Sequence, residues 1–247
     1  MTLKSISATN VKKHKLTFPL RKASGINLKG RNVARFRGKK AKNINYSINY
    51  LRTELDCVGL VLSVFKTMGK STFIALIKYH NGAFSYVPAT YGMHIGQFTS
   101  SFTNFNYNRT MKKFLLPGTI ILLRLISRYS IFSNLQLTSA SRAKYARAAG
   151  TYCQLIDKFE DYQMAVIKLP TGINKVIHLD AFVCLGRNSN IMHKFTTFGK
   201  AGMRRIKGSR PIVRGVARNP VDHPNGGRTK TNKPEKSLWG WVAKNNC

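Results

Sequence analysis

The 247-residue sequence predicts an all-β centre of small barrels or sandwiches between two basic arms without regular structure. Three observations lead to this prediction. Short runs of β-branched and aromatic residues alternate with turn signals through the centre of the chain. Positive charge is concentrated at both ends of the chain. Residues 214–227 carry prolines and glycines at a spacing that is incompatible with a helix or a strand.

The clearest expected element is a hairpin near residue 80. Residues 72–79 and 83–87 are rich in β-branched and aromatic residues, and the pair Asn81-Gly82 lies between them. Asn-Gly between two such runs is the strongest short-range hairpin signal, because both central residues of the turn need a positive φ. We therefore expect two antiparallel strands joined by an Asn-Gly turn.

A similar unit follows later in the chain. Residues 164–169 and 175–179 are short apolar runs, and a Pro-Thr-Gly turn at 170–172 separates them. Other short strands are expected in three further segments of this kind. These are residues 58–64, 119–125 and 151–156.

Helical character is nearly absent. The single candidate is the alanine-rich segment 139–149, which is short enough to be a turn instead. Residues 111–117 are expected to form the seam between two β units. The longest apolar run, 114–126, is interrupted by a proline, a glycine and an arginine and is too short to span a bilayer.

The charge distribution indicates the partner. The 42 Lys and Arg against eight Asp and Glu give a net charge of +34. Residues 1–42 hold 13 of these bases and no acid, and residues 188–247 hold 13 bases and two acids. Such self-repulsion destabilises a compact state unless anions neutralise it. The arms are too broken by Gly, Pro and Asn for an amphipathic membrane helix, so a phosphate backbone is the expected polyanion.

The tail segment 214–227 supports the same interpretation. It has few apolar residues to bury and gains little by folding on itself, so it needs an outside surface to order it. Cations flank the segment on both sides, and that surface is therefore expected to be polyanionic.

Cysteine spacing indicates neither a zinc site nor a disulfide framework, because the four cysteines form no C-x-x-C pair. Reduced thiols in an intracellular compartment are the expectation. The cysteines are Cys57, Cys153, Cys184 and Cys247.

Two patterns imitate catalytic sites. Residues 69–71, Gly-Lys-Ser, resemble the end of a phosphate-binding loop, but Val64 stands where that motif opens with glycine, so a strand-connecting turn is expected. Asp222 beside His223 offers a carboxylate and an imidazole, but no nucleophile or second acid lies nearby in sequence. We expect this pair to pin a turn, with Asp222 accepting backbone N–H bonds and His223 stacking on a base or binding a phosphate or ribose. No catalytic residue is assigned, and we expect the chain not to be an enzyme.

The first 20 residues allow two interpretations. They are basic, acid-free and rich in Ser and Thr, as in a mitochondrial transit peptide. The alternative is an RNA-binding arm that stays on the mature protein. The second is favoured because the basic character continues unbroken to Lys42.

A long run of spaced residues in the C-terminal quarter carries a family resemblance. It comprises Lys200-Ala-Gly202, Arg204, Arg205, Gly208, Arg210-Pro211, Arg214-Gly215, Asn219-Pro-Val-Asp-His-Pro224 and Gly226-Gly227. Upstream residues follow in matching order: Gly30-Arg31, Arg35, Arg37-Gly38, Lys42, Ala149-Gly-Thr-Tyr152, Gln154-Leu155, Leu169-Pro170, Gly172 and Trp239-Gly240. Together, over residues 25–245, they resemble the universal large-subunit ribosomal protein L-two family.

The resemblance implies an OB-fold barrel followed by an SH3-like barrel, with extended basic arms that thread into large-subunit ribosomal RNA. The corresponding division of the chain has four parts. These are a basic N-terminal arm at 1–24, an OB-fold RNA-binding domain at 25–110, an SH3-like barrel at 111–187 and an extended rRNA-binding tail at 188–247.

Several positions depart from the family pattern. Residues 38–41, Gly-Lys-Lys-Ala, stand where the family runs Gly-Gly-Gly-His, and Ile206 stands where a Trp is expected. Arg218 replaces a Met, Asn225 replaces the second His of the proline-histidine segment, and Arg228 replaces a Gly. The very basic extreme C-terminus of the family is cut short.

The function expected from charge and resemblance is that of a structural constituent of the large ribosomal subunit. The chain would bind and stabilise large-subunit rRNA near the peptidyl transferase centre and support subunit association. Arginines between glycines suit phosphate or guanine edges, because the guanidinium is a planar fork and glycine lets the backbone approach RNA closely. The expected RNA-binding residues are Arg31, Arg35, Arg37, Lys39, Lys40, Lys42, Lys200, Arg204, Arg205, Arg210, Arg214, Arg218, Asn219, Asp222, His223 and Arg228. Trp239 and Trp241 are expected either to stack on bases or to seal the tail against a barrel.

The expected partners are large-subunit rRNA, neighbouring ribosomal proteins and the small subunit, without a membrane or a small-molecule substrate. No metal site and no cofactor of the chain itself is expected, so Mg²⁺ would enter only through the RNA. One alternative is a free single-strand RNA-binding OB-fold factor, and another is a nuclease or transferase that uses His223. Abundant Asn, Ile, Phe, Tyr and Lys indicate an organelle-encoded product of the mitochondrial matrix, with a plastid or bacterial cytoplasm as alternatives.

Overall fold

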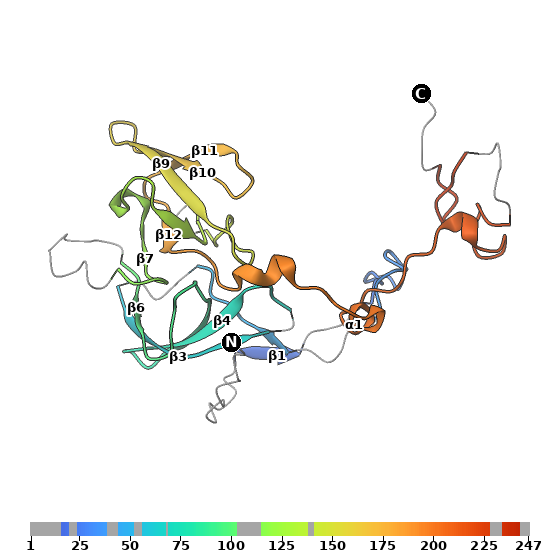
Figure 1. Ribbon diagram of the computed structural model, residues 1–247, viewed down its shortest axis with the longest axis horizontal. Coiled ribbons are helices and arrows are strands. Elements are labelled where there is room, and N and C mark those ends of the chain that lie inside the picture. Colours follow the sequence, from blue (N-terminus) through green and yellow to red (C-terminus); the bar gives the residue numbers. More distant parts are fainter. Residues whose placement is uncertain are drawn as a thin grey trace. The chain divides into compact units, whose positions relative to one another are not determined.

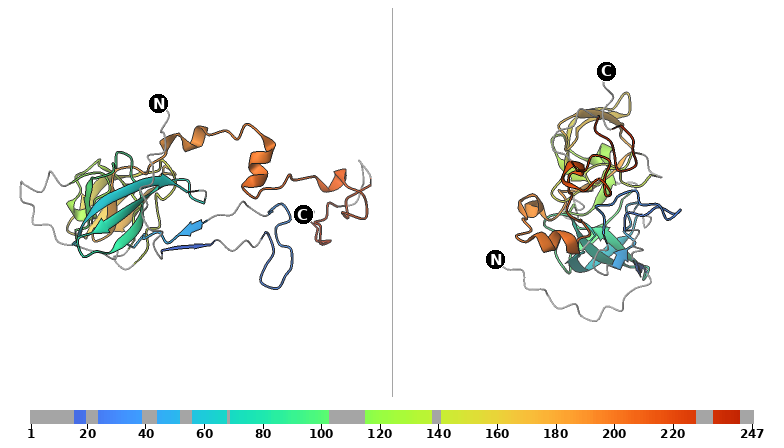
Figure 2. Two further views of the ribbon diagram at one scale, coloured as in Figure 1. Left: turned by 90° about the horizontal axis from the view of Figure 1, so that it is seen from below. Right: turned by 90° about the vertical axis from the view of Figure 1, so that its right-hand side faces the viewer.

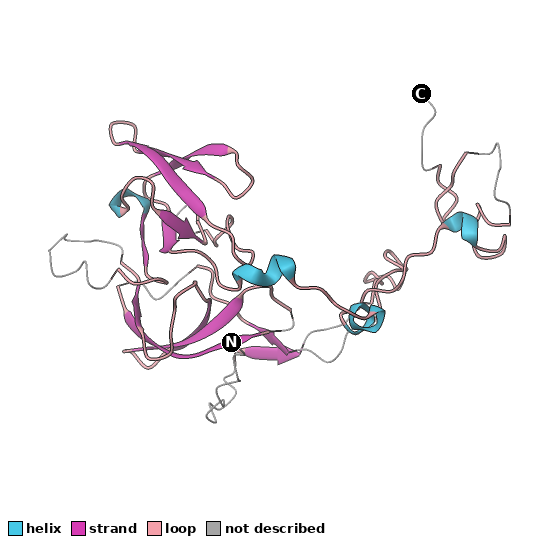
Figure 3. Cartoon of the chain, in the orientation of Figure 1, coloured by secondary structure: helices cyan, strands magenta, loops and turns pink. Residues whose placement is uncertain are grey.

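A computed structural model describes residues 16–19, 24–38, 44–51, 56–67, 69–102, 115–137, 141–227 and 234–242. The chain divides into two compact units, each formed from segments distant in sequence. The first unit comprises Met1–Leu20 and Asn43–Thr197, and the second comprises Arg21–Lys42 and Phe198–Cys247. The sequence boundary at residue 25 assigned residues 25–42 to the first barrel, whereas the structure groups them with the tail. Strands are confined to the first unit among the described residues (Figure 3).

The first sheet has the strand order β5-β4-β3-β6, and all of its pairs are antiparallel. Its strands are β3 (Val58–Lys66), β4 (Phe73–Tyr79), β5 (Phe84–Pro88) and β6 (Phe98–Ser100) (Figure 1). Side chains of β4 alternate between two buried clusters, because successive strand residues point to opposite faces. Ala75 and Ile77 join one cluster, and Ile74 and Leu76 join the other. Because both faces of β4 are buried, its sequence is a nearly continuous apolar run and does not alternate between apolar and polar residues.

A short two-stranded sheet contributes side chains to the second of these clusters. Strands β1 (Thr17–Pro19) and β2 (Ile44–Tyr46) pair antiparallel and lie side by side (Figure 2). The ring of Tyr46 meets Tyr86 edge-on, with a centroid separation of 5.0 Å. The strand pair therefore packs onto the face of the first sheet that carries Ile74, Leu76 and Tyr86.

The predicted hairpin at residue 80 is present, but its turn differs from the expectation. Lys78 pairs with Phe84, which leaves a loop longer than a two-residue turn. The amide N–H of Gly82 donates to the Tyr79 carbonyl oxygen at 3.0 Å, and only Gly82 of the Asn-Gly pair has a positive φ, +81°. Asn81 instead accepts a bond from the Ala83 amide at its Oδ1, 2.9 Å away. The prediction that both turn residues have positive φ is therefore wrong, because a left-handed glycine at the end of the loop closes it.

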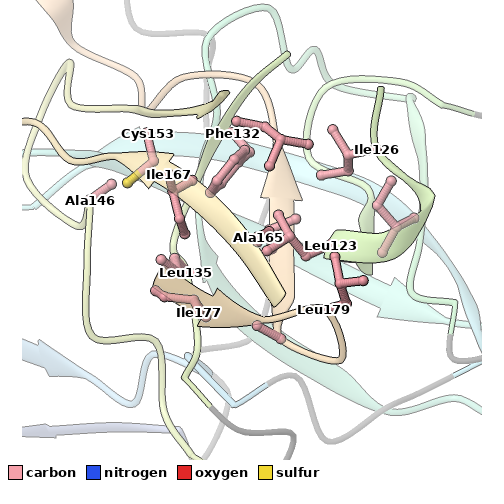
Figure 4. Packing of buried hydrophobic residues seen from close by; sticks show 14 residues of the cluster. Leu123, Ile126, Phe132, Leu135, Ala146, Cys153, Ala165, Ile167, Ile177 and Leu179 are labelled. Atoms are coloured by element: carbon pink, nitrogen blue, oxygen red, sulfur yellow. The ribbon is translucent and has the colours of Figure 1, made fainter. Parts of the chain in front are cut away.

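The second sheet has six strands in the order β11-β10-β9-β8-β12-β7. The predicted hairpin at its edge is confirmed, since Lys168 pairs with Asn174 across the turn that contains Gly172. The strands are β7 (Ile120–Leu122), β8 (Ile131–Ser133), β9 (Cys153–Phe159), β10 (Met164–Lys168), β11 (Asn174–His178) and β12 (Phe182–Leu185). Their inner faces enclose one core in which Phe132, Leu155 and Ile167 are fully buried (Figure 4).

The two sheets confirm the predicted fold class, which is all-β with an OB-fold barrel followed by an SH3-like barrel. Backbone and side-chain bonds join the two barrels within the first unit. The Tyr91 amide donates to the Arg187 carbonyl oxygen at 2.7 Å, and the Phe73 amide donates to Ser189 Oγ at 3.0 Å. The Gly-Lys-Ser sequence at 69–71 lies between β3 and β4, in the strand-connecting loop that was predicted.

Of the two interpretations of residues 139–149, a short helix or a turn, the described part agrees with the turn. Residues 141–149 form no helix, because Leu135 bridges Tyr145 and Ala146 has a left-handed φ of +49°. Residues 119–125 are a strand only to Leu122, followed by the 3-10 helix η2 (Leu123–Leu125). The other helical turns of the described residues follow the barrels in sequence. They are η3 (Ile191–Phe195), α1 (Ala201–Ile206) and η4 (Gly215–Ala217). Among the described residues, none of these helices is long and apolar enough to cross a membrane.

Candidate nucleic-acid interface

The second unit is held together by pairing between two segments that are far apart in sequence. The Gly38 amide donates to the Gly208 carbonyl oxygen at 2.9 Å, and the Arg210 amide donates to the Phe36 carbonyl oxygen at 2.7 Å. Gly208 follows α1 with a φ of +89°, so the chain turns there without the steric cost of a Cβ. The N-terminal basic segment and the tail therefore form one structure.

Four arginines line a groove of about 610 Å³ between these paired segments. Arg35 and Arg37 come from the N-terminal segment, and Arg205 and Arg210 come from the tail. No acidic residue is among the lining side chains. The remaining lining residues are Ser24, Ile26, Asn32 and Gly38.

The guanidinium groups at this groove take part in none of the ion pairs found among the described residues. The ion pairs found among the described residues join Arg124 to Asp180, Arg128 to Asp157 and His178 to Asp180, all on the second barrel. The Nη1 atom of Arg35 is buried and has no hydrogen-bond partner within the described residues. A buried unpaired donor is costly, and phosphate oxygens are among the acceptors that form strong hydrogen bonds with guanidinium groups.

The other predicted cations are distributed along both segments. Arg31, Lys200, Arg204 and Arg214 are exposed, and Arg218 is half-buried. Lys39, Lys40, Lys42 and Arg228 lie outside the described residues. The structure therefore brings four of the predicted arginines into one groove and leaves the described remainder on the surface of the same unit.

A compact turn carries the remaining predicted residues. The amides of Asp222 and His223 both donate to the Asn219 carbonyl oxygen, at 3.0 and 3.2 Å. The Gly227 amide returns to the Arg218 carbonyl oxygen at 3.0 Å and closes the loop. A Cβ on Gly226 would collide with the Asn219 carbonyl oxygen, which explains the glycine. Asn219 and Asp222 are exposed, and the Asp222 carboxylate takes no part in these bonds.

His223 is 5 % exposed, and its imidazole lies against Gly215. Its Nδ1 accepts a bond from the Asn225 amide at 3.1 Å, so in the neutral ring the proton is on Nε2. Burial lowers the pKa of His223 below its ordinary value of 6.5, and the charges of Arg35 and Arg218 lower it further. His223 therefore serves as a neutral, buried anchor of the turn, with little ring surface left for stacking.

Asn225 was noticed in the sequence only as a departure from the family pattern, and the structure gives it a role. Its Nδ2 donates to the Lys236 carbonyl oxygen, and its Oδ1 accepts from the Lys236 amide, both at 3.0 Å. These two bonds attach the segment around Lys236 to the His223 turn. No local sequence signal pointed to this pairing, because the partners are backbone groups eleven residues away.

The two tryptophans follow this attachment and remain exposed. The Ser237 amide donates to the Trp241 carbonyl oxygen at 2.6 Å, which forms a turn with Gly240 at a φ of +87°. Trp239 is 59 % exposed and Trp241 is 76 % exposed. Indole faces this open are available for stacking on bases. Over the part of the chain that the structure describes, no cluster of His, Cys, Asp and Glu could hold a metal ion.

Comparison with known proteins identifies both halves of the chain. Residues 13–101 match the family described as Ribosomal Proteins L2, RNA binding N-terminal domain. Residues 116–240 match Ribosomal Proteins L2, C-terminal domain. The barrels and the tail together are therefore those of a ribosomal protein.

Similar proteins cover nearly the whole chain. The large ribosomal subunit protein uL2m of Paramecium tetraurelia is 34% identical over 233 residues, which is 92% of this chain and 89% of that protein. The uL2 proteins of Bartonella tribocorum and Orientia tsutsugamushi are 33% and 34% identical, over 91% and 92% of this chain and 79% and 80% of their own lengths. The chain belongs to the ribosomal protein L2 family.

Proposed function

We propose that this chain is a structural constituent of the large ribosomal subunit that binds and stabilises large-subunit rRNA. The observation that carries the proposal is the groove of Arg35, Arg37, Arg205 and Arg210, which has no anionic partner among the described residues. Family membership supports it, because the matched N-terminal domain is an RNA-binding domain and the relatives are large-subunit proteins.

The groove supports a specific binding mode. A phosphate in the groove would accept hydrogen bonds from planar guanidinium forks on both paired segments at once. It would thereby fix the N-terminal segment to the tail and offset the repulsion among their charges. Each neutralised phosphate releases counterions, so binding is strongest at low salt. The exposed cations Arg31, Lys200, Arg204 and Arg214 would extend the same contact along the RNA backbone.

The finer assignment also belongs to this proposal. The tail and its His223 turn would lie in rRNA near the peptidyl transferase centre, and the protein would support association of the two subunits. Neighbouring ribosomal proteins and the small subunit are proposed contacts, with Mg²⁺ supplied through the RNA. A buried, neutral His223 suits a structural role in the turn and not a chemical one, so the chain is proposed to have no catalytic activity of its own.

The proposed compartment is the mitochondrial matrix. Its support is the composition of the chain and the mitochondrial relative from Paramecium. The bacterial relatives are as similar in identity, so similarity alone does not separate the compartments.

Sedimentation of ribosomal particles tests the proposal. An epitope-tagged chain expressed in its own cells should migrate with large subunits and with whole ribosomes, and it should remain there at moderate salt. Migration only with free protein or small-subunit particles would contradict it. Rapid, fully reversible exchange on single-stranded RNA outside ribosomes would favour a free RNA-binding factor instead.

A further inference from the structure

A small cavity lies where the two barrels of the first unit meet. Its volume is about 10 Å³, which is room for a single water molecule. Asn49, Tyr50 and Pro88 line it from the first barrel, and the second barrel contributes the rest of the wall. Those residues are Ile120, Asn134, Gln136, Phe182, Val183 and Cys184.

Two residues of this wall, Asn134 and Gln136, each carry a buried acceptor oxygen. Asn134 is 9% exposed and Gln136 is 2% exposed. Asn134 Oδ1 and Gln136 Oε1 are buried and have no hydrogen-bond partner within the described part of the chain. Buried polar groups in folded proteins nearly always have partners, in the protein or in ordered water.

Neighbouring bonds fix the orientation of the Gln136 amide. Its Nε2 donates to the carbonyl oxygens of Tyr50 and Leu51, both at 3.0 Å. Rotating the amide by 180° would place Oε1 against those two carbonyl oxygens, which only accept. Oε1 is therefore the atom left without a donor.

The Asn134 amide is fixed in the same manner through Asn188. Asn188 Nδ2 donates to the carbonyl oxygens of Ala146 and Ala148, at 2.6 and 3.2 Å, so Asn188 Oδ1 must accept. Asn134 Nδ2 supplies that donor at 3.1 Å. Asn134 Oδ1 is consequently an acceptor in need of a donor, and the same cavity is bounded by both orphan residues.

We propose that this cavity is a binding site for one structural water molecule that donates a hydrogen bond to Asn134 Oδ1 and another to Gln136 Oε1. A water molecule has the two hydrogens that two acceptors require. An apolar occupant would leave both oxygens unsatisfied, and a hard cation needs about six oxygen ligands. Gln136 also donates hydrogen bonds to Tyr50 and Leu51 of the first barrel. The water would therefore complete a network of hydrogen bonds between the two barrels.

A high-resolution map of assembled large subunits containing the full chain tests the site directly. The expected result is a discrete peak at about 2.7–3.2 Å from both oxygens. The absence of a peak, in a map that resolves equally deep waters elsewhere in the subunit, would overturn the proposal. A peak surrounded by about six oxygens would overturn it as well, because that site would hold a cation.

A substitution that adds volume to the cavity wall gives a second test. It should speed local hydrogen exchange if the cavity holds a water molecule and slow it if the cavity is dry. Cys184→Val adds volume to the cavity wall, and Cys153→Val is the matched control in the core of the second barrel. Displacing a bonded water leaves its two acceptor oxygens unsatisfied and loosens the local structure. Exchange of the backbone amide hydrogen of Gln136 should therefore accelerate roughly tenfold relative to the control. Slower exchange in Cys184→Val than in the parent would mean that a dry void had been filled, and it would overturn the proposal. Should Cys184→Val fail to assemble, the map of the parent chain still decides.

Discussion

Gly215 and His223 fit together so closely that a Cβ on Gly215 would lie 2.5 Å from the Cε1 atom of the imidazole. The two residues come from either side of the Arg218–Asn219 segment, and their contact buries the histidine ring. Glycine is required here by space and not by its backbone angle, since Gly215 is not among the residues with positive φ. The packing of the tail around His223 therefore requires a residue without a Cβ at position 215.

Substitution of Gly215 should loosen the tail. Gly215→Ala places a methyl group inside the van der Waals radius of the ring, and overpacking of this kind costs about 1–3 kcal/mol. We expect faster hydrogen exchange over residues 219–227 and a smaller fraction of the chain in large subunits after sedimentation. Gly202→Ala is the matched control, because a Cβ at that helical position meets nothing within 4 Å. Equal behaviour of the two variants would show that the contact with His223 does not order the tail.

Replacement of His223 should affect assembly more than chemistry. His223→Ala removes the acceptor of the Asn225 amide and the ring that packs on Gly215, so the turn loses its anchor. His223→Asn offers a side-chain acceptor near the same amide and should recover part of the loss. The measurements are the yield of large subunits and the rate of peptide-bond formation per assembled subunit. A fully assembled His223→Ala particle with an ordered tail and no peptide-bond formation would refute the structural role.

Acidification should weaken the turn through His223. Burial and the nearby Arg35 and Arg218 lower its pKa in the folded state, so the unfolded tail binds the proton more readily. The contribution of the neutral ring to the stability of the turn is complete above pH 6.5, the ordinary pKa of histidine. It is lost as the pH falls from 6.5 toward the lowered pKa of the folded state. Amide protection over residues 219–227, corrected for intrinsic exchange, should therefore decrease between pH 7.5 and pH 5.5. The His223→Asn variant should show no such decrease, and a parent chain with constant protection would contradict the linkage.

The arginine groove should govern the salt sensitivity of RNA binding. Arg210→Ala or Arg37→Ala removes a guanidinium from the groove, so the slope of log K against log salt should fall by about one unit for each lost phosphate contact. Arg128→Ala is the control, because Arg128 lies on the second barrel and is paired with Asp157 at 3.0 Å. The measurement is the binding of the full chain to large-subunit rRNA at several salt concentrations. A slope that changes equally in control and groove variants would remove the groove from the interface.

The strongest elements could be read from the sequence because their information is local. β4 and β5 combine β-branched and aromatic residues with a glycine turn, and both were predicted within a residue or two. β6, β8 and β12 are only three or four residues long and lack such flanking signals, so they were not predicted. Alanine content left residues 139–149 open between a helix and a turn, and pairing of Leu135 with Tyr145 overrides helix propensity in the described part, 141–149.

The candidate site was predictable in composition and not in geometry. Charge and glycine spacing led to the prediction of RNA-binding arginines, but the groove arises from pairing between Gly38 and Gly208, which no local pattern encodes. The burial of His223 and the role of Asn225 likewise depend on contacts across the tail. The unpaired oxygens of Asn134 and Gln136 could not be predicted from the sequence either, because only a tertiary structure shows which side-chain amides are buried without a hydrogen-bond partner.

The bond between Gly38 and Gly208 also sets an order of events during synthesis. Residues 24–38 are translated before both barrels and before the segment around Gly208 with which they pair. Only when the residues around Gly208 have left the exit tunnel can the four arginines meet in one groove. The groove can therefore form only after most of the chain has been made, and a product truncated before Arg205 would lack two of its four arginines.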